Sequence, residues 1–148
     1  MNQSLREMLP KRSFIAAAFA QLNLKERILT HYNAGLPEPI LWRNGQSIPI
    51  KIHNAHPLGG PLNPKFDGTP ITLQPKDRVL FFTDGLTEAL NEAGMMYGEE
   101  RLSTVLTSLG SQEENAQTWI TAIQQDVQTF VGNGGLEDDL TIVGVRIE

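Results

Sequence analysis

Two acidic stretches of this sequence carry the side chains best suited to metal-dependent chemistry. In the first, Asp84 and Gly85 directly follow residues 79–83. Those five residues are apolar, branched or aromatic without alternation, which predicts a strand buried on both faces with a carboxylate at its end. Asp-Gly is also a common turn pair, so the residues alone leave a turn and a ligand site both open.

The second stretch, Glu137-Asp138-Asp139, stands immediately before a strand-like run that starts at Leu140. Neighbouring carboxylates repel one another, and a bound cation relieves that repulsion. Oxygen ligands at strand ends suit hard divalent ions such as Mg²⁺ or Mn²⁺. A solvated acidic loop that keeps a strand end from pairing explains the triplet equally well.

The other candidate residues favour structural roles. His53 and His56 lie in a predicted loop, where no cysteine and no third histidine completes a zinc site. His31 is expected at the surface or at the edge of the core rather than as a catalytic base. Packing is the expected role of Met95-Met96-Tyr97 and of Trp119. The sequence contains no serine nucleophile elbow, phosphate-binding glycine loop or dinucleotide-binding fingerprint.

Strand signals dominate the first half of the chain and its last residues. Residues 13–24 are apolar and Ala-rich, and their periodicity fits either a helix or a strand. Asn44-Gly45 is a strong hairpin signal, and Pro49 marks an edge strand. Residues 75–77 predict a tight turn that pairs the strands on either side of it antiparallel. The predicted strands are 28–34, 40–43, 47–52, 69–74, 79–83 and 140–147, with a loop at 53–68.

In the strand predicted at 47–52, three isoleucines alternate with other residues and should face the core. They are Ile48, Ile50 and Ile52. This alternation predicts a strand with one buried and one wet face.

Helices are expected at the start of the chain and in its second half. The predicted ranges are 2–9, 86–90, 99–109 and a long apolar stripe from 116 to 131. Ser111 and Glu114 form a capping-box pair ahead of the last helix. Strands, then helices, then a closing strand predict an α+β fold of layered antiparallel sheet covered by helices.

Length and composition indicate one globular domain over residues 1–148. The net charge of −5 argues against nucleic acid or an acidic membrane as the partner. Because cysteine is absent, disulfides, thiolate metal sites and a cysteine nucleophile are excluded. No run of about 18 apolar residues and no signal-peptide pattern occurs, so no membrane span is expected and the expected location is the cytoplasm.

Five blocks, in order and at ordinary spacing, resemble the signature blocks of the metal-dependent PPM-type (protein phosphatase 2C-like) serine/threonine phosphatases. The bacterial SpoIIE branch is the best match, although Leu36 stands where that branch usually has histidine. The resemblance runs from about Phe14 to the end of the chain. The blocks are Asn33-Ala34-Gly35-Leu36-Pro37, Leu58-Gly59, Phe82-Thr83-Asp84-Gly85-Leu86-Thr87-Glu88-Ala89, Tyr97-Gly98-Glu99-Glu100-Arg101-Leu102 and Glu137-Asp138-Asp139-Leu140-Thr141.

The resemblance implies an α/β/β/α sandwich with two divalent cations, Mn²⁺ or Mg²⁺, at one end. In that family the cations share a water that attacks phosphorus, and they neutralise charge on the phosphoryl oxygens. It implies Asp84 and Asp138 as metal ligands, and Asp139 behind them or on a further ion. Gly85 would let the metal and its water approach the backbone. Weaker candidates are Thr87, Glu88 and Glu137, for which solvation or helix capping is the alternative.

The family pattern also includes an N-terminal Gly-Asp strand and an Asp-x-x-Gly-x-Gly segment, and neither occurs in this sequence. Asp67, the only aspartate before Asp77, lies in a Pro- and Gly-rich loop. We therefore expect residues 1–148 to be the C-terminal part of the domain, N-terminally incomplete. Such a chain should bind metal weakly, hydrolyse phosphate esters slowly or not at all, and self-associate through an exposed sheet edge, with a homodimer as one outcome.

By resemblance, the function is hydrolysis of phosphoserine or phosphothreonine on a regulatory protein in bacterial signalling. An anti-sigma-factor antagonist would be such a substrate, with an upstream sensor or receiver domain as the controlling partner. The alternative is a non-catalytic pseudophosphatase that binds a signalling partner. The presence of both Asp84 and Asp138 favours the enzyme.

Overall fold

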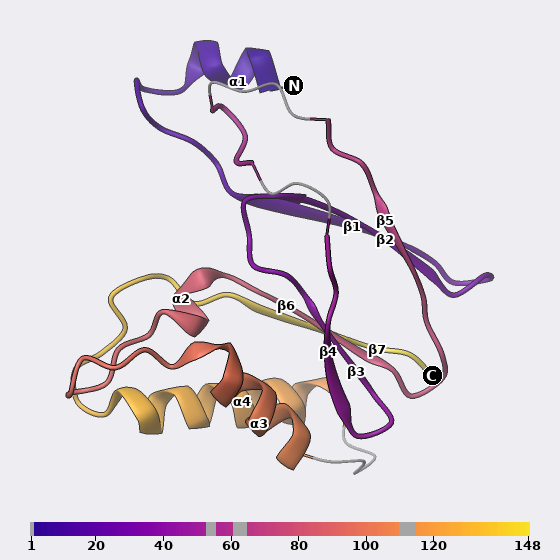
Figure 1. Ribbon diagram of the computed structural model, residues 1–148, viewed down its shortest axis with the longest axis vertical. Coiled ribbons are helices and arrows are strands. Elements are labelled where there is room, and N and C mark those ends of the chain that lie inside the picture. Colours follow the sequence, from indigo (N-terminus) through magenta and orange to yellow (C-terminus); the bar gives the residue numbers. More distant parts are fainter. Residues whose placement is uncertain (1, 53–55, 61–64, 110–114) are drawn as a thin grey trace. The chain divides into compact units, whose positions relative to one another are not determined.

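The computed structural model describes residues 2–52, 56–60, 65–109 and 115–148. The chain divides into two compact units, each built on one antiparallel sheet (Figure 1). Met1–Leu36 and Lys51–Gln74 form the first unit, and Pro37–Ile50 and Pro75–Glu148 form the second. Two antiparallel sheets with flanking helices confirm the predicted α+β class.

The first unit holds a three-stranded sheet in the order β1-β2-β5. Its strands are β1 (Ala17–Asn23), β2 (Ile28–Ala34) and β5 (Thr69–Thr72), and helix α1 spans Asn2–Met8. Strand β1 pairs with β2 along all seven residues, so the ambiguous segment at 13–24 forms a strand. Cross-strand pairing selects this conformation, because residues 18, 20 and 22 fall opposite the buried face of β2.

The second unit holds a four-stranded sheet in the order β4-β3-β6-β7. Its strands are β3 (Ile40–Arg43), β4 (Gln46–Pro49), β6 (Arg78–Phe82) and β7 (Ile142–Arg146), and its helices are α2 (Asp84–Thr87), α3 (Gly98–Ser108) and α4 (Ala116–Val131). Strand β6 lies between β3 and β7, with Val79 and Leu80 fully buried, as its unbroken apolar run predicts.

Helices α3 and α4 lie along one side of the four-stranded sheet and enclose the main core (Figure 1). Close packing is visible at Gly144 on β7, where an added Cβ would lie 3.2 Å from Ile120 of α4. The buried core residues are Ile40, Trp42, Leu80, Phe82, Leu86, Ala89, Tyr97, Leu102, Leu106, Trp119, Ile123, Val127 and Val131. The predicted core position of Trp119 is confirmed. Because β6 is packed into this core, the core fixes the position of Asp84, which follows the end of the strand.

Arg78 is a buried cation at the start of β6. Its guanidinium carbon lies 4.8 Å from the ring centroid of Trp42 and 5.9 Å from that of Trp119. Beside it, buried Asp77 accepts two hydrogen bonds from Arg43, at 2.9 and 2.6 Å. The bond to Asp77 raises the pKa of Arg43. Cation–π stacking and ion pairing therefore allow charges in the wall of an apolar core, which sequence periodicity did not indicate.

The predicted turn at residues 75–77 does form, but the pairing assigned to it is wrong. Strand β5 pairs with β2, whereas β6 pairs with β3 and β7. The reason lies at Lys76 and Asp77, whose backbone bonds with Ile147 commit this point of the chain to the second sheet. The turn therefore connects two sheets instead of closing a hairpin.

Strand β4 is an edge strand, as Pro49 predicted, but it ends at Pro49 instead of Ile52. Ile50 is buried, yet Ile48 is 40% exposed, so the predicted alternation is wrong at Ile48. An edge strand has a neighbour on one side only, which leaves its side chains less covered.

Most other boundaries shift by one or two residues, but the strand formed within residues 13–24 begins only at Ala17. Helix α2 begins at Asp84 rather than at Leu86, and Asn115 is the N-cap of α4, accepting a 2.9 Å bond from Thr118 N–H. The predicted capping pair Ser111 and Glu114 lies outside the described residues. No helix within the described ranges is long and apolar enough to span a membrane.

Replacing Leu80 by alanine should lower the free energy of unfolding of the chain by about 2–5 kcal/mol, because it removes a fully buried side chain from the interior strand. Urea denaturation followed by circular dichroism measures the change. The matched control is Met95→Ala at a position that is 60% exposed, with an expected change within about 0.5 kcal/mol. Equal losses in the two variants would contradict the assigned core.

Candidate functional site

Thr83 joins the end of β6 to the segment that leads into β7. Its N–H donates to the Thr141 carbonyl at 3.1 Å. Its hydroxyl donates to the Asp139 carbonyl at 3.1 Å and accepts from the Thr141 N–H at 3.0 Å. Because Thr83 precedes Asp84, these bonds place the two predicted acidic stretches side by side, although 56 positions separate Thr83 from Asp139.

Gly85 makes the closest approach between the two stretches. A Cβ added to it would lie 2.6 Å from the Asp139 carbonyl oxygen and 3.5 Å from that of Asp138. Real Cβ atoms do not tolerate the shorter distance, so glycine is required for the backbones to meet. The Gly85 N–H donates to Oδ1 of Asp84 at 3.1 Å, which orients that carboxylate at the first turn of α2.

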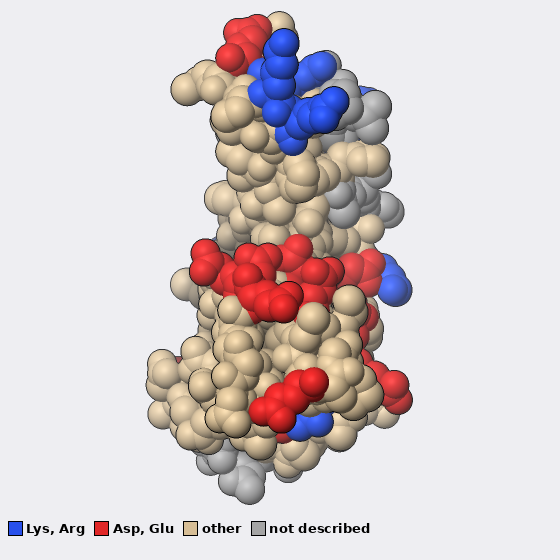
Figure 2. All heavy atoms as spheres, turned by 90° about the vertical axis from the view of Figure 1, so that its left-hand side faces the viewer, with Lys and Arg blue, Asp and Glu red and all other residues tan. Residues whose placement is uncertain are grey.

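The acidic side chains at this end of the sheet are exposed. The exposed acids are Asp84 at the start of α2, Glu88 at its C-cap, and Glu137, Asp138 and Asp139 in the loop before β7. Figure 2 shows acidic side chains gathered in a band across the face that carries α2 and this loop in Figure 1. Water therefore screens their mutual repulsion, and the carboxylates remain accessible to a cation.

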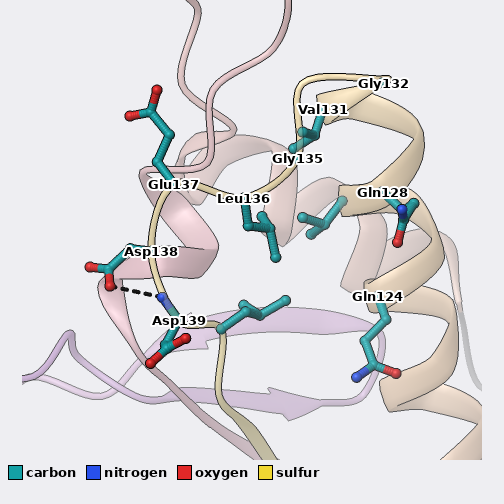
Figure 3. A pocket seen from close by; sticks show the side chains of 11 residues that line it. Gln124, Gln128, Val131, Gly132, Gly135, Leu136, Glu137, Asp138 and Asp139 are labelled. Carbon is teal, nitrogen blue, oxygen red and sulfur yellow. Dashed lines mark hydrogen bonds between the residues drawn. The ribbon is translucent and has the colours of Figure 1, made fainter.

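Figure 3 shows the carboxylates of Glu137, Asp138 and Asp139 on the side of the loop that faces away from α4. Oδ1 of Asp138 accepts the Asp139 N–H at 2.8 Å, which holds the two residues in a tight local turn. The bonds at Asp84 and at Asp138 are alike, since each carboxylate accepts the N–H of the residue that follows it.

A pocket of about 840 Å³ lies between the same loop and α4. Its wall on α4 includes Gln124, Gln128 and Val131, and its wall on the loop includes Leu136 and Leu140. In Figure 3 Leu136 points toward α4, while the neighbouring acids point away from it. The pocket therefore has a mixed lining, because Glu137, Asp138 and Asp139 of the loop border it together with Leu136 and Leu140.

The donor chemistry of the acidic surface fits Mg²⁺ or Mn²⁺, because all its candidate ligands are oxygens. The number of donors is small, however. Among the residues that the structure describes, no group of three or more His, Cys, Asp or Glu is placed to hold a metal ion. The chain's own carboxylates therefore match part of a ligand set.

The weaker candidates have structural explanations. The Thr87 hydroxyl donates to the Asp84 carbonyl at 3.3 Å within α2, and Glu88, the C-cap of that helix, is exposed. His56 is exposed, and His53 lies outside the described part of the chain. His31 is 1% exposed, so its predicted surface or core-edge position is wrong, and burial lowers its pKa.

A cluster of charged and aromatic side chains connects helices α3 and α4. Asp126 of α4 accepts the Tyr97 hydroxyl at 2.8 Å and two bonds from Arg101 of α3, at 2.8 and 3.0 Å. The Arg101 guanidinium also lies over the rings of Tyr97 and Phe130. These bonds connect α3, α4 and the turn after α2, since Tyr97 N–H donates to the Ala89 carbonyl at 2.8 Å.

The cluster shifts the titration of its members. Hydrogen bonds from Arg101 hold the pKa of Asp126 below its ordinary value, and burial raises the pKa of Tyr97. The predicted packing role of Tyr97 is confirmed by its 3% exposure, but Met95 and Met96 are 60% and 64% exposed, so packing is wrong for them. Arg101 stands in the Tyr97–Leu102 block, so the sequence drew attention to it. No sequence pattern singled out its partner Asp126.

The family model described as Stage II sporulation protein E (SpoIIE) matches residues 1–148. A curated relative, Protein IcfG of Synechocystis sp. (strain ATCC 27184 / PCC 6803 / Kazusa), is 24% identical over 133 residues, which are 89% of this chain and 20% of IcfG.

Two solved structures share the fold. The SiaA-PP2C domain of Pseudomonas aeruginosa superposes with a TM-score of 0.81 at 21% identity, covering 99% of this chain and 57% of that one. The Mn-presoaked phosphatase domain of the cell fate determinant SpoIIE from Bacillus subtilis gives a TM-score of 0.71 at 16% identity, covering 90% and 56%. The chain thus spans little more than half of these structures and a fifth of IcfG.

Replacing Gly85 by alanine should push the segment around Asp139 away from Asp84, because the new methyl group has no room beside the Asp139 carbonyl. We expect the dissociation constant for Mn²⁺ to rise at least tenfold and the free energy of unfolding to fall by about 1–3 kcal/mol. The matched control is Gly134→Ala in the same loop, where an added Cβ would lie 3.8 Å from the Val131 carbonyl oxygen. Unchanged Mn²⁺ binding in the Gly85 variant would argue against this contact as a determinant of the site.

The lowered pKa of Asp126 predicts an acid-sensitive contribution to stability. A carboxylate whose folded-state pKa is depressed stabilises the fold above its ordinary value of 3.8, and this contribution disappears as the pH falls through the lowered value. The stability of the wild-type chain should therefore fall more steeply below about pH 4 than that of Asp126→Asn. Arg101→Met, which removes the cause of the shift but keeps the carboxylate, should flatten the profile in the same way. Parallel profiles for all three proteins, measured by urea denaturation, would contradict the assignment.

Proposed function

The chain belongs to the SpoIIE family of PPM-type phosphatase domains, and we propose that it supplies part of a metal-dependent site for hydrolysis of phosphoserine or phosphothreonine on a regulatory protein. The observation that supports this proposal is the meeting of Asp84-Gly85 with Asp138-Asp139 at one end of the four-stranded sheet. The hydrogen bonds of Thr83 and the small size of Gly85 bring the two backbone segments together, and neither requires a bound ion.

Asp84 and Asp138 would bind divalent cations, Mn²⁺ or Mg²⁺, directly. Asp139 would support Asp138 or bind a further ion. When bound, the cations would supply an activated water and neutralise charge on the phosphoryl oxygens. The protein's own contribution is positioning: the N–H groups of Gly85 and Asp139 orient the two carboxylates, at 3.1 and 2.8 Å. Their exposure leaves room for a phosphorylated side chain of another protein.

Two or three carboxylates bind Mg²⁺ weakly, because this ion gives up its hydration water reluctantly. We therefore propose that the complete site needs carboxylates beyond those of these 148 residues, and that the chain alone hydrolyses p-nitrophenyl phosphate slowly or not at all. The substrate class, a phosphorylated regulator of the anti-sigma-factor-antagonist type, and control by a sensor or receiver domain follow from the family resemblance and form part of the same proposal.

The second candidate is a non-catalytic module that binds a signalling partner. The small number of metal-ligating groups in the described ranges favours it. The two candidates differ in one measurable property, because a binding module has no need of a defined cation site at Asp84 and Asp138.

Titration with Mn²⁺, followed by two-dimensional amide NMR, should broaden the resonances of Asp84, Gly85, Asp138 and Asp139 first. Paramagnetic broadening detects a bound ion even at low affinity, and Mg²⁺ provides the diamagnetic reference. The double variant Asp84→Asn with Asp138→Asn should lose this local effect. The matched control, Asp67→Asn, alters an exposed aspartate of the other unit and should leave the effect unchanged.

Broadening spread evenly over all the exposed acids would contradict a defined cation site and would favour the binding module. Broadening confined to the four residues together with rapid Mn²⁺-dependent turnover of p-nitrophenyl phosphate would retain the phosphatase and overturn the need for further ligands.

A further inference from the structure

Helix α2, which begins at Asp84, is a single turn of four residues. An isolated helix of this length is unstable in water, so contacts outside the helix must hold it. Thr83 fixes the residue before Asp84 through its bonds to the segment ahead of β7. The far end of α2, where the Glu88 N–H donates to the Asp84 carbonyl at 2.8 Å, needs a second support.

Residues 88–97, here called the α2–α3 loop, form a closed loop beside that end of α2. The Tyr97 N–H donates to the Ala89 carbonyl at 2.8 Å, and the next pair of residues inward forms an antiparallel β-bridge. The side-chain oxygen of Asn91 accepts two further backbone N–H bonds within the loop, at 3.0 and 2.9 Å. Tyr97 is therefore joined directly to the residues that follow α2.

Tyr97 also attaches the α2–α3 loop to α4. This residue is 3% exposed, its ring packs edge-on against Phe130 at 5.3 Å between centroids, and its hydroxyl donates to Asp126 at 2.8 Å. Burial and the Asp126 carboxylate raise the pKa of Tyr97, so the hydroxyl keeps its proton and remains a donor. Because two bonds from Arg101 hold the accepting carboxylate in place, the hydroxyl has a fixed partner on a long helix.

The α2–α3 loop makes a further contact with the start of the segment that precedes β7. Oε1 of Glu92 accepts from the backbone N–H and from the side-chain amide of Asn133, at 3.5 and 3.4 Å. A Cβ added to Gly132 would lie 3.1 Å from the same oxygen. Since Asn133 belongs to the segment that leads to Asp138, one loop contacts the elements that carry both acidic stretches.

We propose that Tyr97 is a positioning residue for Asp84. Its hydroxyl holds the α2–α3 loop on α4, and this loop holds α2 with the Asp84 carboxylate in place beside Asp138-Asp139. All these groups lie within Pro75–Glu148 of the second unit. The consequence for cation binding rests on the proposed function, whereas the positioning itself is a property of the metal-free chain.

The variant Tyr97→Phe keeps the buried ring and removes only the hydroxyl. In two-dimensional amide NMR of the metal-free chain, the resonances of Asp84 and Gly85 should shift. The Glu88 N–H should exchange about fivefold faster, because one hydrogen bond that supports α2 is lost. The Thr83 N–H, which bonds to the Thr141 carbonyl, should keep its exchange rate.

The matched control is Ile123→Val, which removes one carbon from a fully buried residue of α4 and destabilises the core without touching the Tyr97 bond. It should leave the resonances of Asp84 and Gly85 and the exchange of the Glu88 N–H unchanged. Circular dichroism checks that both variants fold.

The Mn²⁺ broadening titration measures the consequence for the cation site. The dissociation constant should be about tenfold higher for Tyr97→Phe than for the wild-type chain, as expected when a metal ligand loses a supporting bond. It should be unchanged for Ile123→Val.

Unchanged amide resonances and exchange in metal-free Tyr97→Phe would overturn the positioning role. Equal changes in the two variants, or equally faster exchange at Thr83, would also overturn it, since they would reflect a general loss of stability. If the wild-type chain shows no local Mn²⁺ broadening, the proposed function fails, and the metal-free measurements still decide the role of Tyr97. Local broadening in the wild-type chain with the same Mn²⁺ affinity in Tyr97→Phe would retain the proposed function and overturn the dependence of cation binding on Tyr97.

Discussion

The candidate site depends on one local constraint, the contact between the end of β6 and the segment before β7. Thr83 makes three hydrogen bonds across this contact, and Gly85 has no side chain to hold the backbones apart. Both residues act on the backbone, so they bring together two acidic stretches that have no attraction for each other. A shared metal site at Asp84 and Asp138 requires this contact, because it is what brings the two residues to the same end of the sheet.

The energetics explain why the contact must be set by the backbone. Two carboxylates about 6 Å apart in water repel by about 0.7 kcal/mol, which exposed groups tolerate without a cation. The acids are exposed, so their crowding alone does not demand a metal. The close backbone approach at Gly85 is the more specific feature, because only glycine fits there. A solvated acidic loop would not need this restriction on the sequence. Behind it, buried β6 and the Tyr97–Arg101–Asp126 bonds hold α2, α3 and α4 at fixed positions.

The sequence predicted most elements and the meeting of the two acidic stretches, because these follow from periodicity, turn residues and short blocks in register. It did not predict which strands pair across the turn at 75–77, since that choice depends on backbone bonds to Ile147 at the far end of the chain. Buried Arg78 between Trp42 and Trp119 also escaped prediction, because a charge within a strand indicates solvent unless its aromatic partners are known. For the same reason His31 was expected nearer the surface than its 1% exposure. Local signals thus predict elements, whereas long-range partners decide the environment of polar residues.

Charge is distributed unevenly along the chain, and this distribution separates two kinds of surface. The second unit carries the exposed acids at the candidate metal site, where another copy of an acidic chain would be repelled. The first unit carries a segment without charged residues at 14–24. Electrostatics therefore disfavours association of two copies at the candidate site.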